Sequence, residues 1–95
     1  MELIWSKEAQ FQLSQIYFYY KKHFNSKVAN NVKLSIYDAV KLLKTYPNMG
    51  SVCEKQWDDS IEFRAFFEHK NHKIIYYIEN NTVYIADIWA CNMDH

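Results

Sequence analysis

A chain of 95 residues fits a single domain, close to the size below which one hydrophobic core no longer suffices. Aromatic residues make up 18% of it, and a single glycine and a single proline predict a compact chain without flexible linkers or disorder. There is no signal-peptide pattern and no run approaching the ~20 apolar residues of a membrane span, which predicts a cytoplasmic protein that does not enter a membrane.

The net charge of zero conceals an asymmetry between the two halves of the chain. Residues 1–46 carry seven lysines against three acids, a net charge of +4, whereas residues 47–95 carry four basic residues against eight acids, a net charge of −4. Arg64 is the single arginine. Because phosphate neutralisation supplies most of the affinity of nucleic-acid binders, any such surface would have to lie on the first half.

The N-terminal part of the sequence predicts a strand and then a helix. Glu2–Trp5 is a short apolar run, and Ser6 suits the N-cap position of the helix that follows. Apolar residues then recur at spacings of three and four, which is one face of a helix; they are Ala9, Leu13, Ile16, Tyr20 and Phe24. Asn25 is expected in the left-handed conformation that ends a helix, and Ser26 as the cap of the next.

A second amphipathic stripe predicts a second helix of similar length. Its members are Ala29, Val32, Ile36, Ala39, Val40 and Leu43. The helix is expected to end at Tyr46, because the only proline and the only glycine fall in the turn Pro47–Gly50. The short connection between the two helices predicts an antiparallel hairpin.

The remainder of the chain changes from a helical period to a period of two. Residues 51–60 are expected to be irregular, and three strands are expected at 61–68, 73–79 and 82–90, joined by hairpin turns at 69–72 and 80–81. The sequence therefore predicts one α+β domain over residues 1–95. In it, an N-terminal strand and a helical hairpin pack on a three- to four-stranded antiparallel sheet.

Five short motifs occur in order along nearly the whole chain: Ile4–Ala9, Pro47–Gly50, Glu62–Arg64, Lys73–Ile78 and Val83–Trp89. Each is unspecific alone, but together they resemble the RelE/ParE family of bacterial toxins. They match its capped first helix, its Pro-x-x-Gly turn, its arginine-bearing strand and its last two strands. The resemblance implies a toxin held inactive by a cognate antitoxin, present as a homodimer or as a toxin–antitoxin hetero-oligomer.

The resemblance leaves three mechanisms open. ParE-like members poison DNA gyrase by binding, whereas RelE-like members cut messenger RNA on the ribosome, and a degenerate member would bind an antitoxin without being toxic. Fold is a poor guide between such functions. The neutral charge and the lone arginine favour a ParE-like inhibitor that acts by binding and needs no cofactor.

A RelE-like nuclease would need a base, an acid and cations around the phosphate. The candidates are Arg64 as one cation and Glu54 or Lys55 as base or second cation. Relatives commonly carry an arginine shortly after the last strand, but Asn92 occupies that position here and cannot neutralise a phosphate. The sequence therefore favours binding over cleavage.

Arg64 has a structural alternative, an ion pair with a neighbouring acid such as Glu62 or Glu68. His69 and His72 are three residues apart, but a hairpin turn would point them in different directions, so no metal site is predicted.

Cys53 and Cys91 are expected as reduced, buried thiols with a structural role.

Four residues are candidates for partner binding: Phe11, Phe18, Trp89 and Asn92. Phe11 and Phe18 are seven residues apart and fall nearly opposite the apolar stripe of the first helix, among polar residues. Either a partner covers them, or Trp5 or residues 51–60 do. An apolar surface on the sheet side would suit an antitoxin segment that adds as a helix or a strand.

Overall fold

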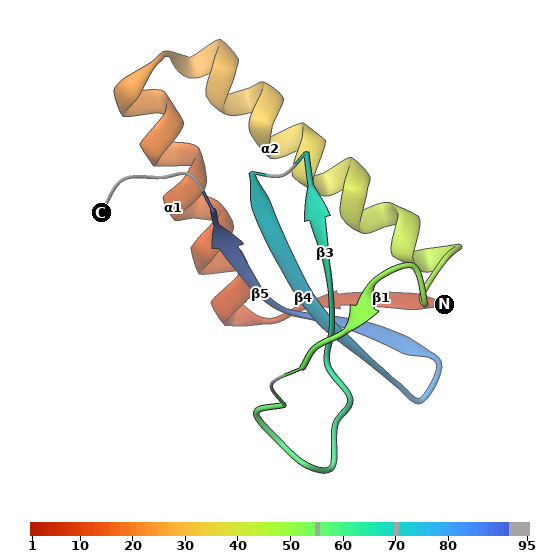
Figure 1. The fold of residues 1–95 in the computed structure, drawn as a ribbon. Coiled ribbons are helices and arrows are strands. Elements are labelled where there is room, and N and C mark those ends of the chain that lie inside the picture. Colours follow the sequence, from red (N-terminus) through yellow and green to blue (C-terminus); the bar gives the residue numbers. More distant parts are fainter. Residues whose placement is uncertain (55, 70, 92–95) are drawn as a thin grey trace.

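Two helices pack against one face of a five-stranded sheet (Figure 1). The structure is a computed structural model that describes residues 1–54, 56–69 and 71–91. The elements are β1 (Glu2–Trp5), α1 (Lys7–His23), α2 (Ser26–Lys41), a 3₁₀ turn (Leu42–Lys44), β2 (Ser51–Val52), β3 (Arg64–Glu68), β4 (His72–Glu79) and β5 (Thr82–Ala90). None of the helices in the described part of the chain has the length and apolarity that crossing a membrane requires.

The first helix begins as the sequence predicts. The Ser6 hydroxyl accepts a hydrogen bond from the Ala9 amide at 3.0 Å, which satisfies one of the free donors of the first turn. The same hydroxyl donates to the Ala86 carbonyl of β5 at 2.9 Å. One side chain therefore both starts α1 and ties it to the last strand.

The connection between the helices differs from the prediction. Asn25 is extended, with φ of −162°, and its side chain accepts a hydrogen bond from the Val28 amide at 2.8 Å. The predicted left-handed Asn25 was wrong, because the residue caps α2 instead, and Ser26 is the first residue of that helix rather than its cap. At the other end α2 stops at Lys41, and the 3₁₀ turn continues the coil to Lys44.

The turn Pro47–Gly50 is held by one tyrosine of the sheet. The Tyr76 hydroxyl donates to the Pro47 carbonyl at 2.7 Å and accepts from the Gly50 amide at 2.9 Å. A Cβ on Gly50 would lie 2.8 Å from the Tyr76 oxygen and 2.9 Å from the Ala65 carbonyl oxygen. Only glycine therefore lets the turn approach the sheet so closely.

The sheet has the order β1-β5-β4-β3-β2. The meander β3–β4–β5 is antiparallel as predicted, and Asn80 and Asn81 form its second turn with φ of 52° and 60°. Two details correct the predicted three- to four-stranded antiparallel sheet. β1 pairs parallel with β5, and residues 51–52, expected to be irregular, add a short fifth strand. Neither pairing could be predicted from the sequence. A two-residue strand such as β2 is too short to show an alternating pattern, and the direction in which β1 pairs with β5 depends on the path of the chain between them.

An irregularity in β5 decides which side chains face the helices. Tyr76 pairs with Ile85, but Ile75 pairs with Asp87, so Ala86 is an extra residue, as in a β-bulge. Before the bulge, Val83 and Ile85 belong to the core, and after it Ile88 does. The side chains of Asp87 and Trp89 therefore lie on the face of the sheet away from the helices, the open face.

The core lies between the helices and the sheet, and both predicted stripes contribute to it. It contains Ala9, Leu13, Ile16, Ile36, Val40, Leu43, Ile74, Tyr76, Val83, Ile85 and Ile88. Phe24 was wrongly assigned to the first stripe, because it is 63% exposed. It follows the last residue of α1, and its ring stacks on Tyr20 with centroids 5.9 Å apart.

Candidate functional site

Arg64, the proposed phosphate-binding cation, opens β3 beside the Pro47–Gly50 turn. Its side chain is only 22% exposed. The guanidinium donates to the Gly50 carbonyl at 2.8 Å and lies 3.5 Å from the Glu62 carboxylate. The alternative of an ion pair with Glu62 is therefore observed, and the pair with Glu68 is not, because Glu68 points at Ser35 and His72.

The other residues proposed for a nuclease are not joined to Arg64 in the described part of the chain. Glu54 is exposed, and no hydrogen bond or ion pair among the described residues connects it to the guanidinium. Lys55 and Asn92 lie outside the described residues. Arg64 itself links the Pro47–Gly50 turn to β3, through its hydrogen bond to the Gly50 carbonyl.

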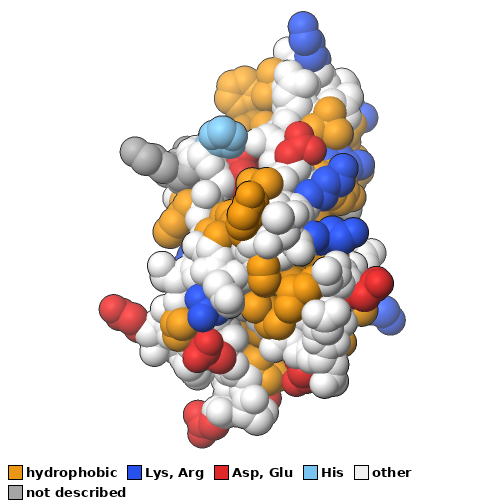
Figure 2. All heavy atoms as spheres, turned by 90° about the vertical axis from the view of Figure 1, so that its right-hand side faces the viewer, with side chains coloured by type: hydrophobic (Ala, Val, Ile, Leu, Met, Phe, Trp, Pro, Cys, Tyr) orange, Lys and Arg blue, Asp and Glu red, His pale blue; other side chains and the backbone are white. Residues whose placement is uncertain are grey.

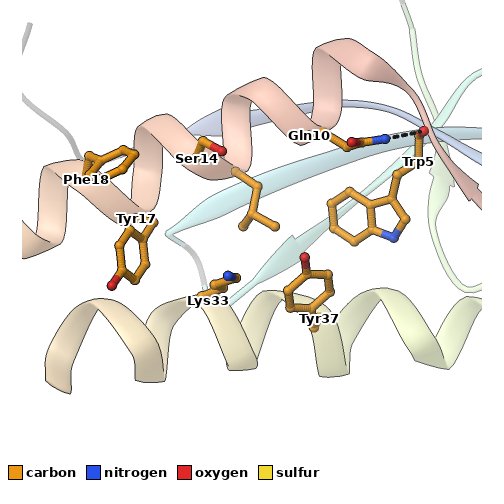
Figure 3. Close-up of a pocket in the computed structure, with 8 residues that line it drawn as sticks. Trp5, Gln10, Ser14, Tyr17, Phe18, Lys33 and Tyr37 are labelled. Atoms are coloured by element: carbon orange, nitrogen blue, oxygen red, sulfur yellow. Dashed lines mark hydrogen bonds between the residues drawn. The ribbon is translucent and has the colours of Figure 1, made fainter. Parts of the chain in front are cut away.

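Phe18 lines a groove between the two helices, here called the helix groove (Figure 3). The groove has a volume of about 570 Å³, and its lining residues are Trp5, Gln10, Leu13, Ser14, Tyr17, Phe18, Lys33 and Tyr37. The Lys33 ammonium lies 5.5 Å from the Tyr17 ring centroid and 6.0 Å from that of Tyr37. The groove is therefore aromatic, with one lysine of its own between two of its rings.

Trp5 does not cover the two phenylalanines of α1. Its ring packs on Tyr37 at a centroid distance of 5.3 Å, and Phe11 and Phe18 remain 58% and 59% exposed. Phe11 does not line the helix groove. The two residues thus stay open on the described surface, as partner-binding residues would.

Trp89 belongs to a second surface, on the open face of the sheet. It lines a pocket of about 180 Å³, here called the sheet pocket, together with Trp57, Phe63, Ile75, Ala86 and Asp87. Trp57 stands nearly perpendicular to Trp89, at 86° and 6.0 Å between centroids, and to Phe63, at 89° and 5.3 Å. Aromatic rings thus form several walls of the pocket.

Asp87 is the acid of the sheet pocket, and its position is fixed by two hydrogen bonds. One carboxylate oxygen accepts from the Trp89 indole nitrogen at 2.7 Å, and the other accepts from the Ile88 amide at 2.9 Å. The first bond also orients the Trp89 ring. Beside it, the Lys73 ammonium lies 5.3 Å from the Trp89 ring centroid, although Lys73 does not line the pocket.

The open face continues from the pocket as a row of aromatic rings. Phe63 contacts Tyr77 at 5.5 Å, and Tyr77 stacks on Tyr84 at 5.0 Å and 15°. Burial, with smaller contributions from Glu79 and Tyr84, raises the pKa of the Tyr77 hydroxyl above its usual value. Tyr77 is therefore a neutral hydrogen-bonding group at physiological pH.

A buried polar cluster, unforeseen from the sequence, joins α2 to the sheet. Glu68 accepts a hydrogen bond from the Ser35 hydroxyl on α2, and its other oxygen lies 2.8 Å from the His72 ring nitrogen. His72 is buried and His69 is exposed, but both rings approach the same Glu68 carboxylate, at 2.8 Å and 3.7 Å, so the prediction that the hairpin turn points them in different directions was wrong. The sequence could have indicated this cluster only through the cross-strand pairing of Glu68 with His72. That pairing cannot be read without knowing the register of the β3–β4 hairpin. Among the described residues no group of three or more potential ligands could hold a metal ion.

Both cysteines are free thiols, and Cys91 is exposed rather than buried as expected. It directly follows the last strand, where no element among the described residues covers it.

Comparison with known proteins identifies the family. A family model described as ParE toxin of the type II toxin–antitoxin system parDE matches residues 3–95. The chain belongs to this family. The match confirms the resemblance drawn from the ordered motifs and extends it over nearly the whole sequence.

A solved structure supports the ParE-like fold. A chain of a chromosomal ParDE toxin–antitoxin system from P. aeruginosa superposes with a TM-score of 0.79, covering 95% of each chain at 20% sequence identity. At that identity the likeness concerns the fold. No curated protein matches the chain.

Proposed function

We propose that this ParE-family toxin inhibits its target by binding to it, that the target is DNA gyrase, and that a cognate antitoxin neutralises the toxin in the cytoplasm. The observation that carries the toxin assignment is the family match over residues 3–95. The finer points rest on how the candidate residues are placed.

The state of Arg64 supports binding over cleavage. A phosphate-binding arginine has to offer its planar fork to the substrate. Here the guanidinium donates to the Gly50 carbonyl and pairs with Glu62, and its side chain is mostly buried. Arg64 is the only arginine of the chain and so the residue best suited to stabilise a phosphorane. Its guanidinium is instead bound to the Pro47–Gly50 turn.

The exposed aromatic surfaces support a protein partner. Single exposed apolar residues are ordinary, but contiguous apolar surface on a small protein commonly marks an interaction site. Phe11 and Phe18 on α1, and Trp57 and Trp89 on the open face, offer two such surfaces. We assign one of these surfaces to an antitoxin segment and the other to the target. The toxin is expected in a hetero-oligomer with its antitoxin, or as a homodimer when it is free.

Two assays on the purified chain, run in parallel, separate the mechanisms. One measures DNA supercoiling by gyrase, and the other measures cleavage of messenger RNA on programmed ribosomes. We expect inhibition of supercoiling, reversed by the antitoxin encoded beside the toxin gene, and intact messenger. Cleavage without gyrase inhibition would instead establish the RelE-like alternative.

The substitution Arg64→Ala distinguishes the nuclease mechanism from the binding mechanism. In a RelE-like nuclease with Arg64, Glu54 and Lys55 in its site, the substitution would abolish cleavage. In a binding toxin we expect it to lower stability while supercoiling inhibition persists in the folded fraction. If neither activity is found and induced cells grow normally, the chain is a degenerate member that only binds antitoxin.

A further inference from the structure

We propose that the sheet pocket is a binding site for the side chain of an arginine presented by a protein segment. The inference does not depend on whether the chain is toxic. It rests on the walls of the pocket, its size, its acid and the charge of the surrounding half of the molecule.

The walls of the pocket suit a cation. A cation is attracted to the face of an aromatic ring within ~6 Å of the ring centroid, and tryptophan is the strongest such partner. Trp57, Trp89 and Phe63 line the pocket, and the Trp57 ring stands nearly perpendicular to the other two. The Lys73 ammonium, 5.3 Å from the Trp89 centroid, shows that a cation already associates with this ring from outside the pocket.

The acid of the pocket favours arginine among cationic side chains. Each oxygen of a carboxylate can accept two hydrogen bonds. Each oxygen of Asp87 accepts one, from Trp89 or from Ile88, so one position on each remains. A guanidinium donates two parallel hydrogen bonds to a carboxylate and stacks on aromatic rings at the same time, whereas an ammonium acts as a point charge.

The volume argues for a single side chain. Pockets for drug-sized molecules or cofactors usually have ~300–1,000 Å³. The sheet pocket has about 180 Å³, and the buried Ile75 is among its lining residues. It therefore admits a small group, with the rest of the ligand lying outside.

The surroundings argue that this ligand belongs to a protein. Beyond Phe63 the open face continues as the stacked pair of Tyr77 and Tyr84, and Phe67 on β3 is exposed. This aromatic surface resembles the central part of protein interfaces in composition. Residues 47–95 carry a net charge of −4, which attracts a basic segment.

A second copy of this chain does not supply the arginine. Arg64 is the only arginine, and its guanidinium is bound to the Gly50 carbonyl and to Glu62. The arginine must therefore come from a different protein.

The test uses the full chain labelled with ¹⁵N and follows its three tryptophan indole signals. The probe is N-acetyl-arginine methylamide, and the control is N-acetyl-citrulline methylamide, which has the same shape without the charge. We expect the Trp57 and Trp89 signals to shift saturably at millimolar arginine amide. Trp5 packs on Tyr37 on the helix side and serves as the unmoved reference. Equal shifts with citrulline, shifts of all three signals, or no saturable shift would overturn the proposal.

Two substitutions in opposite directions sharpen the test. Asp87→Asn keeps the shape and can still accept the Trp89 hydrogen bond, and we expect about fivefold to tenfold weaker binding of arginine amide. Lys73→Gln removes the neighbouring positive charge, and we expect about twofold to threefold tighter binding. An unchanged Trp5 signal checks that both variants are folded. Unaltered affinity in both folded variants would contradict the assigned site.

A final comparison distinguishes a protein segment from a small guanidinium compound. The second probe is a capped tripeptide with arginine between leucine and phenylalanine. We expect it to bind more tightly than the arginine amide, since its apolar side chains reach Tyr77 and Tyr84. If the two probes bind equally, the occupant is a small molecule and the proposal of a protein segment is wrong.

Discussion

The helix groove and the sheet pocket are both aromatic, yet they differ in how they are built and in charge. The groove is formed by residues at helical spacings together with Trp5, and it places Lys33 between Tyr17 and Tyr37. The pocket is formed by the bulged strand β5, its neighbour β4 and the loop before β3, and it contains Asp87. The same kinds of ring thus line one cavity whose charged lining residue is a lysine and another whose charged lining residue is an aspartate, with Lys73 beside Trp89 but not in the lining.

The two surfaces also lie in halves of opposite charge. Figure 2 shows Lys and Arg side chains mostly over the upper and right part of one face and acidic side chains mostly over its lower part, with apolar side chains between them. This distribution follows the net charges of +4 and −4 of the two halves of the sequence. An acidic partner segment would therefore prefer the helix layer, and a basic one the open face of the sheet.

Insertion of one alanine between Asp87 and Ile88 should have the largest effect, because it shifts the register of the rest of β5 by one residue. Ile88 then leaves the core for the open face, and Trp89 turns toward the helices. We expect a loss of about 3 kcal/mol or more, or failure to fold. Urea unfolding followed by circular dichroism measures it. Ala90→Gly, near the end of the same strand, is the control for a local change in β5, and an insertion as mild as this control would show that the register of the strand is not what sets its stability.

The tryptophans of the two surfaces should differ in their importance for stability. Trp5 is half-buried against the core and contacts Tyr37, whereas Trp57 is exposed beside the sheet pocket. We expect Trp5→Ala to lower the free energy of unfolding by about 2–4 kcal/mol and Trp57→Ala by about 1 kcal/mol or less. Chemical denaturation of both variants gives the comparison. Equal losses would mean that the pocket is part of the core rather than an addition to it.

Removal of the cation from the helix groove should have a smaller effect. Lys33→Gln abolishes both cation–π contacts while keeping much of the side-chain length. We expect a loss of about 0.5–1 kcal/mol, reduced little by salt because the rings shield the ammonium. Thermal unfolding at low and high ionic strength measures it, with Lys41→Gln on the same helix as the control. A loss that disappears in salt would indicate ordinary surface charge instead.

The smallest effect at neutral pH should belong to Tyr77, whose role appears only in alkali. Burial raises its folded-state pKa above the unfolded value of ~10. The stability this provides is fully present below pH ~10 and is lost as the pH rises through the folded-state pKa. We expect Tyr77→Phe to lose less stability than the parent chain between pH 9 and pH 11, as thermal melts at each pH would show. Identical pH profiles would indicate that the hydroxyl is not desolvated.

Local signals predicted most of the fold. Ser6 at the start of α1, both helical stripes, the Pro47–Gly50 turn and the Asn80–Asn81 hairpin act through contacts a few residues apart, so they can be read along the chain. The ordered motifs added the family. Asn25 was misassigned because the same residue type suits both the end of one helix and the start of the next.

The candidate site depended on contacts that no local signal reports. Phe18 could be predicted as exposed from its place on the helix, but that it lines the same groove as Lys33 and Tyr37 depends on how the two helices pack. Arg64 was read as a strand residue, and its bond to Gly50 needs the turn and the strand in place. Trp89 was singled out alone, and the loop from β2 to β3 brought Trp57 and Phe63 to it.

By itself the sequence determined that this chain is an α+β domain of the ParE toxin family with a basic first half and an acidic second half. The fold class follows from period, caps and turns, each of which spans few residues, while the family follows from the order of short motifs and the charge of each half from its composition. Only the tertiary structure decided that Arg64 binds the Gly50 carbonyl, that β1 pairs parallel with β5, and that a one-residue bulge places Asp87 and Trp89 on the open face. A register change of one residue exchanges the two faces of a strand, and only the pairing of distant strands determines that register.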